Sequence, residues 1–188
     1  MARQITDAAM QKATGYGSEH WFPILDAMAE DGMERKDIVM KFWKTYDGDL
    51  SAWWAQMTTV EWERDRGRRV LNQSCSGSFQ MSVQKTFAGD EMAAWDAVVT
   101  TDWLSGLKYQ EGFEFSHDGY DLTVRAVRSG KMLRLWWQKD EHKSVLEVMF
   151  VPAKEKCAIR FQHQKLADEI DVDIFKNRWK AVLADIVS

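Results

Sequence analysis

Four histidines are the side chains of this sequence that acid–base or metal chemistry would use first. They are His20, His117, His142 and His163. No HExxH, GxSxG or glycine-rich phosphate motif surrounds them, and no His/Cys cluster has metal-ligand spacing. The sequence therefore predicts no metal site and no cofactor. Only His163 falls on the expected inner face of a strand, where a shifted pKa could serve catalysis. A single inward histidine is typical of a hydrogen-bonded core residue, so no catalytic residue is predicted.

A second candidate for function is a run of cations in residues 51–69, SAWWAQMTTVEWERDRGRR, where four arginines follow two adjacent tryptophans. On a helix, such a run could contact the phosphates of nucleic acid. The run also holds Glu61, Glu63 and Asp65, each three or four residues before an arginine, as in ion pairs on a solvated helix surface. Residues 1–75 contain ten Lys/Arg and twelve Asp/Glu, a balance of −2, which gives no general attraction for a polyanion. We therefore expect core tryptophans, surface arginines and no nucleic-acid partner.

The composition is that of a folded chain. Its 188 residues are 45% hydrophobic and 29% charged, which suits one large domain or two small ones. No apolar stretch is long enough to cross a bilayer, and the N-terminus lacks the apolar run of a signal peptide. Cys75 and Cys157 are far apart and are interpreted as free thiols of a reducing compartment. These features predict a cytoplasmic protein with no membrane contact.

The period of the hydrophobic pattern changes near residue 76. Before this point the spacing is helical, with helices predicted from Ser18 to Gly32, from Glu34 to Tyr46 and from Ser51 onward. The segment 73–78, QSCSGS, is typical of a linker. Short helices of this kind must pack on one another to be stable. Residues 1–75 are therefore predicted to form a small three-helix accessory domain.

Residues 76–188 alternate between polar and apolar side chains over several strand lengths. Residues 78–87 read as a half-buried strand, followed by one helix that begins at Asp90 and a shorter one over 102–107. Five strand-like runs come next: GFEFS, YDLTVRAV, MLRLWWQ, SVLEVMFV and CAIRFQHQ. The short turns between them indicate an antiparallel meander, and a long amphipathic helix follows over 168–186. The predicted fold is α+β, a curved antiparallel sheet of about six strands that grips the long C-terminal helix.

This order of elements resembles the START-like helix-grip (SRPBCC) superfamily. Within it, the likeness is to the family related to activators of the heat-shock chaperone's ATPase, also labelled polyketide cyclase-like. It rests on SFQMSVQKTFAG, EMAAWDAVVTTDW and FKNRWKAVLADI, and it covers residues 76–188. The resemblance implies a sheet that encloses space against its last helix. TGYGSEHWFPILD, KDIVMKFW and SAWWAQMTTVEWERDRG resemble a small helical domain of unknown function that precedes helix-grip domains in bacterial proteins.

An apolar and aromatic inner face remains when the polar member of each strand alternation is placed outside. Ten residues on this face and on the last helix are predicted to line a ligand cavity. They are Phe113, Phe115, Leu135, Trp137, Val148, Phe150, Phe161, His163, Phe175 and Trp179. The alternative is that these side chains fill a close-packed core. A sheet that curves away from its helix favours the cavity.

The sequence thus predicts binding of a small hydrophobic or amphipathic molecule between the sheet and the last helix, without a strong catalytic apparatus. One alternative is an enzyme of the cyclase or hydrolase type that uses His163 and a bound water. Another is a protein-interaction module, linked to a chaperone through the family resemblance. A homodimer is compatible with an exposed sheet edge or with the Trp-rich helices.

Overall fold

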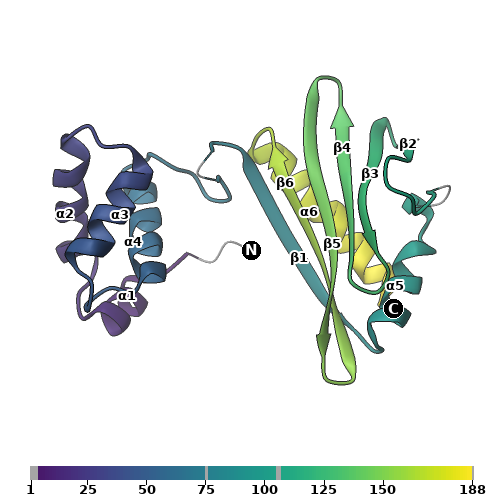
Figure 1. The fold of residues 1–188 in the computed structure, drawn as a ribbon, viewed down its shortest axis with the longest axis horizontal. Helices are drawn as coiled ribbons and strands as arrows, with labels where there is room; N and C mark the ends of the chain where they lie inside the picture. Colours follow the sequence, from purple (N-terminus) through teal and green to yellow (C-terminus); the bar gives the residue numbers. More distant parts are fainter. Residues whose placement is uncertain (1–3, 75, 105–106, 188) are drawn as a thin grey trace. The chain divides into compact units, whose positions relative to one another are not determined.

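A computed structural model describes residues 4–74, 76–104 and 107–187 (Figure 1). The chain folds into two compact units, one that ends at Leu71 and one that begins at Asn72. We call the first the helical unit and the second the helix-grip unit, and each is described by itself. Cys75 and part of the short helix expected over 102–107 lie outside the described residues. None of the described helices combines the length and the apolarity that a membrane crossing requires.

The helical unit contains four helices among its described residues. They are α1 (Asp7–Thr14), α2 (Ser18–Glu30), α3 (Arg35–Thr45) and α4 (Ala52–Asp65). The prediction of three helices misses α1, which is short and buries only Met10 and Thr14, so no apolar stripe marks it in the sequence. Local capping defines its ends instead. The Thr6 hydroxyl accepts a hydrogen bond from the Ala9 N–H, and Gly15 follows the last turn with a φ of 81°.

Trp62, and not Trp53, is the large anchor of α4 in the core of the helical unit. Trp62 is 1% exposed, whereas Trp53 is 58% exposed, so the expectation of a core position for Trp53 is wrong. A buried stripe of Ala55, Thr58, Thr59 and Trp62 has the i, i+3, i+4, i+7 spacing of one helix face. Apolar patterning overlooks this face because half of its members are threonines.

The helix-grip unit is built on a six-stranded antiparallel sheet in the described part of the chain, with the order β1-β6-β5-β4-β3-β2. The strands are β1 (Phe79–Phe87), β2 (Glu114–His117), β3 (Tyr120–Arg128), β4 (Met132–Lys139), β5 (His142–Ala153) and β6 (Lys156–Leu166). Strands β2 to β6 form the expected meander. The first strand, β1, pairs with the last, β6, and therefore forms one edge of the sheet.

Two helices and one 3-10 turn accompany the sheet: α5 (Glu91–Val99), η1 (Asp102–Leu104) and α6 (Glu169–Ile186). The Asp168 carboxylate caps α6 by accepting a hydrogen bond from the Asp171 N–H at 2.9 Å. The buried stripe of α6 is Val172, Phe175, Trp179 and Leu183. This helix packs against β1 and β6, and the sheet curves around it (Figure 1). The α+β helix-grip fold predicted from the sequence is confirmed.

Candidate functional site

The structure brings the ten predicted ligand-binding residues together in the core of the helix-grip unit. Eight of them are almost fully buried, and Phe113 and Phe115 are half-buried and pack against the same core. The eight are Leu135, Trp137, Val148, Phe150, Phe161, His163, Phe175 and Trp179. The inward face read from the strand alternation is therefore correct for these strands.

Rings from the sheet and from α6 contact one another directly in this core. The ring centroid of Trp179 lies 5.2 Å from that of Phe161 and 5.3 Å from that of Trp137. The Phe175 and His163 centroids are 4.2 Å apart. Contacts at these distances are those of a packed aromatic interior. A ligand contact for the ten residues stays a prediction.

His163 is held by hydrogen bonds to both of its ring nitrogens. Ser144 Oγ donates to the Trp137 carbonyl at 2.9 Å, so its hydrogen is used. The same oxygen lies 2.8 Å from His163 Nε2 and must accept there. The Trp179 indole N–H donates to His163 Nδ1 at 3.3 Å. These bonds assign the ring hydrogen to Nε2 and occupy the lone pair of Nδ1.

Burial lowers the pKa of His163 from its ordinary 6.5 to about 3, and the positive charges of Arg178 and His142 act in the same direction. The ring is therefore neutral near pH 7, with both nitrogens engaged. A general base needs a lone pair free to take a proton. The geometry gives His163 a structural role, and the cyclase or hydrolase alternative loses the residue on which it depended.

The other candidate groups for chemistry are also engaged in structure. Burial, together with the negative charge of Glu91, raises the pKa of the Cys157 thiol, which makes it a poor nucleophile. His142 Nε2 lies 2.7 Å from the Lys165 carbonyl oxygen. In the ranges that the structure describes, no group of three His, Cys, Asp or Glu side chains is arranged to hold a metal ion.

The two glutamates of α4 that precede the four arginines of residues 64–69 bind cations from more than one helix. Arg64 pairs with Glu61 at 2.6 Å, as expected for residues three apart. Glu63 instead accepts from Arg35 of α3 at 2.8 Å and lies 3.3 Å from Arg69. Glu61 and Glu63 are only 6% and 8% exposed. The expectation of a wholly solvated ion-pair surface is therefore wrong for these two glutamates.

The remaining two arginines contact α2 and the indole of α4. Arg66 pairs with Asp26 at 2.7 Å, and the Trp62 indole N–H donates to the same carboxylate at 2.7 Å. The Arg68 guanidinium lies 4.8 Å from the centroid of the Trp62 ring. Each of these side chains already has a partner inside the helical unit.

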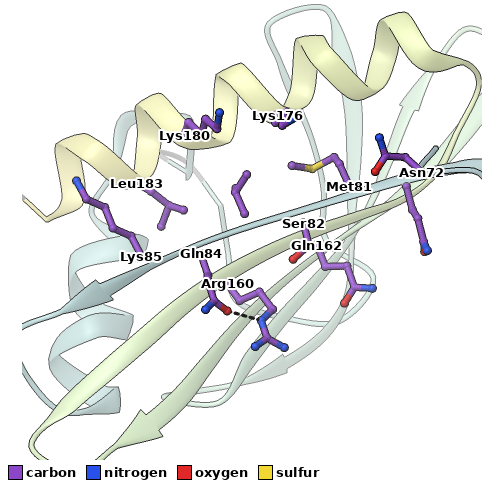
Figure 2. Close-up of a pocket in the computed structure, with 12 residues that line it drawn as sticks. Asn72, Met81, Ser82, Gln84, Lys85, Arg160, Gln162, Lys176, Lys180 and Leu183 are labelled. Carbon is purple, nitrogen blue, oxygen red and sulfur yellow. Dashed lines mark hydrogen bonds between the residues drawn. The ribbon is translucent and has the colours of Figure 1, made fainter. Parts of the chain in front are cut away.

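A groove of about 670 Å³ runs along the edge strand β1, where β1 and β6 meet α6 (Figure 2). Its lining consists of Asn72, Gln80, Met81, Ser82, Val83, Gln84, Lys85, Arg160, Gln162, Lys176, Lys180 and Leu183. None of the ten predicted ligand-binding residues belongs to this lining. The groove is therefore a separate candidate site.

Alternation along β1 decides which side chains face α6. Met81 and Lys85 point toward the helix, and Gln84 points to the opposite face of the sheet (Figure 2). Val83 has the parity of Met81 and Lys85, so it shares their face. On the opposite face, Arg160 Nε donates to Gln84 Oε1 at 3.0 Å.

The part of the groove nearest to the core is apolar. Met81 and Leu183 are 5% and 2% exposed and belong to the core of the unit, and Val83 is half-buried beside them. Amide and hydroxyl side chains and four cations complete the lining. The arrangement can hold an apolar group against the floor and a polar group at the rim.

Sequence reasoning missed the groove, although one signal for it was present. The apolar face of the first strand contains Phe79, Met81, Val83 and Phe87, and Lys85 interrupts it. A charged residue at an inward position is typical of an edge strand, where the buried side opens to solvent. Lys176 and Lys180 stand four residues apart on the helix that faces this strand, which places them on one side of it.

No protein-family model matches the chain, and no curated protein matches it in sequence. The solved structures that are similar in fold include two with a TM-score of 0.50. Protein MLL2253 from Mesorhizobium loti is 18% identical, and the match covers 57% of this chain and 93% of that one. CalU16 from Micromonospora echinospora is 12% identical, over 59% of this chain and 77% of its own. At these identities the likeness concerns the fold alone.

Proposed function

We propose that the helix-grip unit binds a small amphipathic molecule in the groove between β1 and α6. The observation that carries the proposal is the groove itself, whose volume of about 670 Å³ lies within the roughly 300–1,000 Å³ of small-molecule sites. Its apolar floor continues into the core, and its rim is polar. This combination matches a ligand with one apolar end and one polar end.

The proposal keeps the ligand class expected from the sequence and changes its contacts. The sequence alone predicts a lining in the aromatic interior, whose rings touch one another across the space between sheet and helix. The groove lies at the edge of the same sheet and helix, where half-buried Val83 is in reach of a ligand from solvent, and the almost fully buried Met81 and Leu183 also line it. Each methylene that a ligand buries there contributes about 0.8 kcal/mol to binding.

Binding rather than catalysis is also supported by the chemistry of the lining. Its polar side chains are amides, a hydroxyl and cations, and it contains no carboxylate or imidazole. An acid–base reaction at neutral pH usually relies on one of these two groups with a tuned pKa. The polar groups that are present suit orientation of a ligand.

Native mass spectrometry and thermal unfolding of the full chain test the proposal. We expect a retained small molecule, or a higher Tm with medium-chain amphiphiles, because a ligand at 100 times its Kd stabilises the folded state by about 2.7 kcal/mol. Val83→Trp should fill the groove and abolish both effects while the far-UV spectrum is unchanged.

The matched control is Val151→Trp, which adds the same ring at an exposed position of β5 that is outside the groove lining. This variant should behave as the wild type does. The proposal is wrong if the wild type neither retains a molecule nor gains stability across the panel. It is also wrong if Val83→Trp binds as well as the control.

A further inference from the structure

The charged side chains of the groove all carry the same sign. They are Lys85, Arg160, Lys176 and Lys180, and the lining contains no Asp or Glu. The three lysines are on the α6 side of the sheet, and Arg160 is on its opposite face beside Gln84. The chain as a whole has a formal net charge of −4, so a described lining with four cations and no acid departs from the average of the molecule. A local excess of one sign raises the concentration of oppositely charged ligands at a groove.

The lysines lie on the two walls of the groove. Lys176 and Lys180 are on α6, and Lys85 extends from β1 toward that helix (Figure 2). Residues four apart are neighbours on a helix surface, and like charges at this spacing repel each other. Protection of the β1 edge against other strands accounts for one inward lysine but not for the pair on α6. A bound anion would relieve the repulsion within that pair.

Among the described residues, no carboxylate forms an ion pair with any of the four cations of the lining. Arg178, which is near Lys176 and Lys180 in the sequence of α6, pairs with Asp118 at 2.8 Å. Of the three cations on α6, Arg178 thus has a carboxylate partner, whereas Lys176 and Lys180 have none among the described residues. These two lysines line the groove.

We infer that the ligand of the groove is an amphipathic anion, whose negative head group binds between Lys85 and the pair Lys176 and Lys180. This inference rests on the proposed function and specifies its ligand class. The apolar part of the molecule lies along Met81, Val83 and Leu183. Lysine ammonium groups act as point charges, so they suit a carboxylate or a phosphate head group equally.

Isothermal titration of the full chain with decanoate, decanol and decyltrimethylammonium tests the sign of the head group at constant chain length. Decanoate should bind about tenfold more tightly than decanol at low salt, since each exposed ion pair adds a factor of about 1.4 to 5. High salt should reduce this preference, because exposed charges are screened. Inorganic phosphate alone should bind far more weakly than decanoate, because it lacks the apolar part.

The variant Lys176→Gln/Lys180→Gln should bring the affinity for decanoate to within about twofold of that for decanol, and leave decanol binding unchanged. The control Lys131→Gln/Lys156→Gln removes two exposed lysines outside the lining and should keep the preference for decanoate.

The outcomes separate the two proposals. Equal binding of decanoate and decanol, or tightest binding of decyltrimethylammonium, overturns the anion and leaves the binding function intact. If phosphate binds as tightly as decanoate, the ligand needs no apolar part, and only its negative charge remains supported. No binding of any probe overturns the proposed function and the inference together.

Discussion

The arginines that follow Trp62 and the cations of the groove differ in their surroundings, although each set holds four positive charges. The first set is Arg64, Arg66, Arg68 and Arg69, and the second is Lys85, Arg160, Lys176 and Lys180. In the first set, three arginines have carboxylate partners and the fourth lies over an indole ring. Within the described residues, the second set has no carboxylate partner.

This difference shows that a dense run of cations in a sequence does not indicate which positive charges can bind a ligand. The arginine run is the densest cluster of cations in the chain, yet each of its charges already has a partner inside the helical unit. The groove cations are scattered along the sequence from Lys85 to Lys180, and folding gathers them around one site. Three experiments test whether the two units respond differently to acid and to the loss of a cation.

Acid should lower the stability of the helix-grip unit more than that of the helical unit, and this is the largest of the expected effects. His163 has a folded pKa of about 3 against an ordinary 6.5, so its contribution to stability is complete above pH 6.5 and is lost as the pH falls toward 3. The loss is about 1.4 kcal/mol per pH unit, of the order of 5 kcal/mol in all. In the helical unit, the hydrogen bond from Arg66 lowers the pKa of Asp26, so its contribution is lost only below the ordinary value of 3.8.

Urea titrations followed by two-dimensional NMR at pH 7 and pH 4.5 check this order, because amides of β6 and α4 report on each unit separately. His163→Gln removes the titrating group and should flatten the response of the helix-grip unit. Equal losses of stability in the two units at pH 4.5 would contradict the assignment.

Removal of an arginine that has a carboxylate partner should destabilise the helical unit. Arg64→Met leaves Glu61 almost buried, and the donor that remains to it among the described residues is the backbone N–H of Ile5 at 3.0 Å. We expect a loss of about 2 kcal/mol, less than the roughly 3–5 kcal/mol of a fully buried pair. Urea unfolding of α4 amides measures it. The second change Glu61→Gln should recover part of the loss, and a double variant no better than the single one would show that the pair is not responsible.

Removal of a groove lysine that lacks a carboxylate partner should have the smallest effect, and it should raise stability rather than lower it. Lys180→Met relieves the repulsion with Lys176, so the helix-grip unit should change by less than about 0.5 kcal/mol and toward higher stability. The free energy of unfolding from β6 amides gives the value. A loss above about 1 kcal/mol would mean that Lys180 has a stabilising partner and is not available to a ligand.

The sheet and its inner face were predictable because a strand has a period of two that short segments already reveal. Leu135, Val148 and Phe161 were assigned to the interior from alternation alone, and all three are completely buried. The position of α6 followed from its apolar stripe and from the short turns of the meander. These features depend on residues that are close together in the sequence.

The helical unit was less predictable because small and polar residues decide its contacts. Met10 is the one buried apolar side chain of α1, so that helix has no periodic signal. Thr58 and Thr59 are fully buried in α4, whereas the more hydrophobic Trp53 is exposed. Glu63 binds Arg35, which is 28 residues earlier in the chain and lies outside any helical spacing rule.

The amino-acid sequence was sufficient to predict an α+β chain with a helical first part, a sheet of about six strands that includes a five-strand meander, and an inward face of aromatic residues. Local periodicity, turns and caps are sufficient for that. The tertiary structure was needed to show that His163 has both nitrogens engaged, that the aromatic rings touch one another, and that Lys85, Lys176 and Lys180 line one groove. Pairing of β1 with β6 and packing of α6 on the sheet bring these residues together, and contacts between residues so distant in sequence leave no pattern in a single chain.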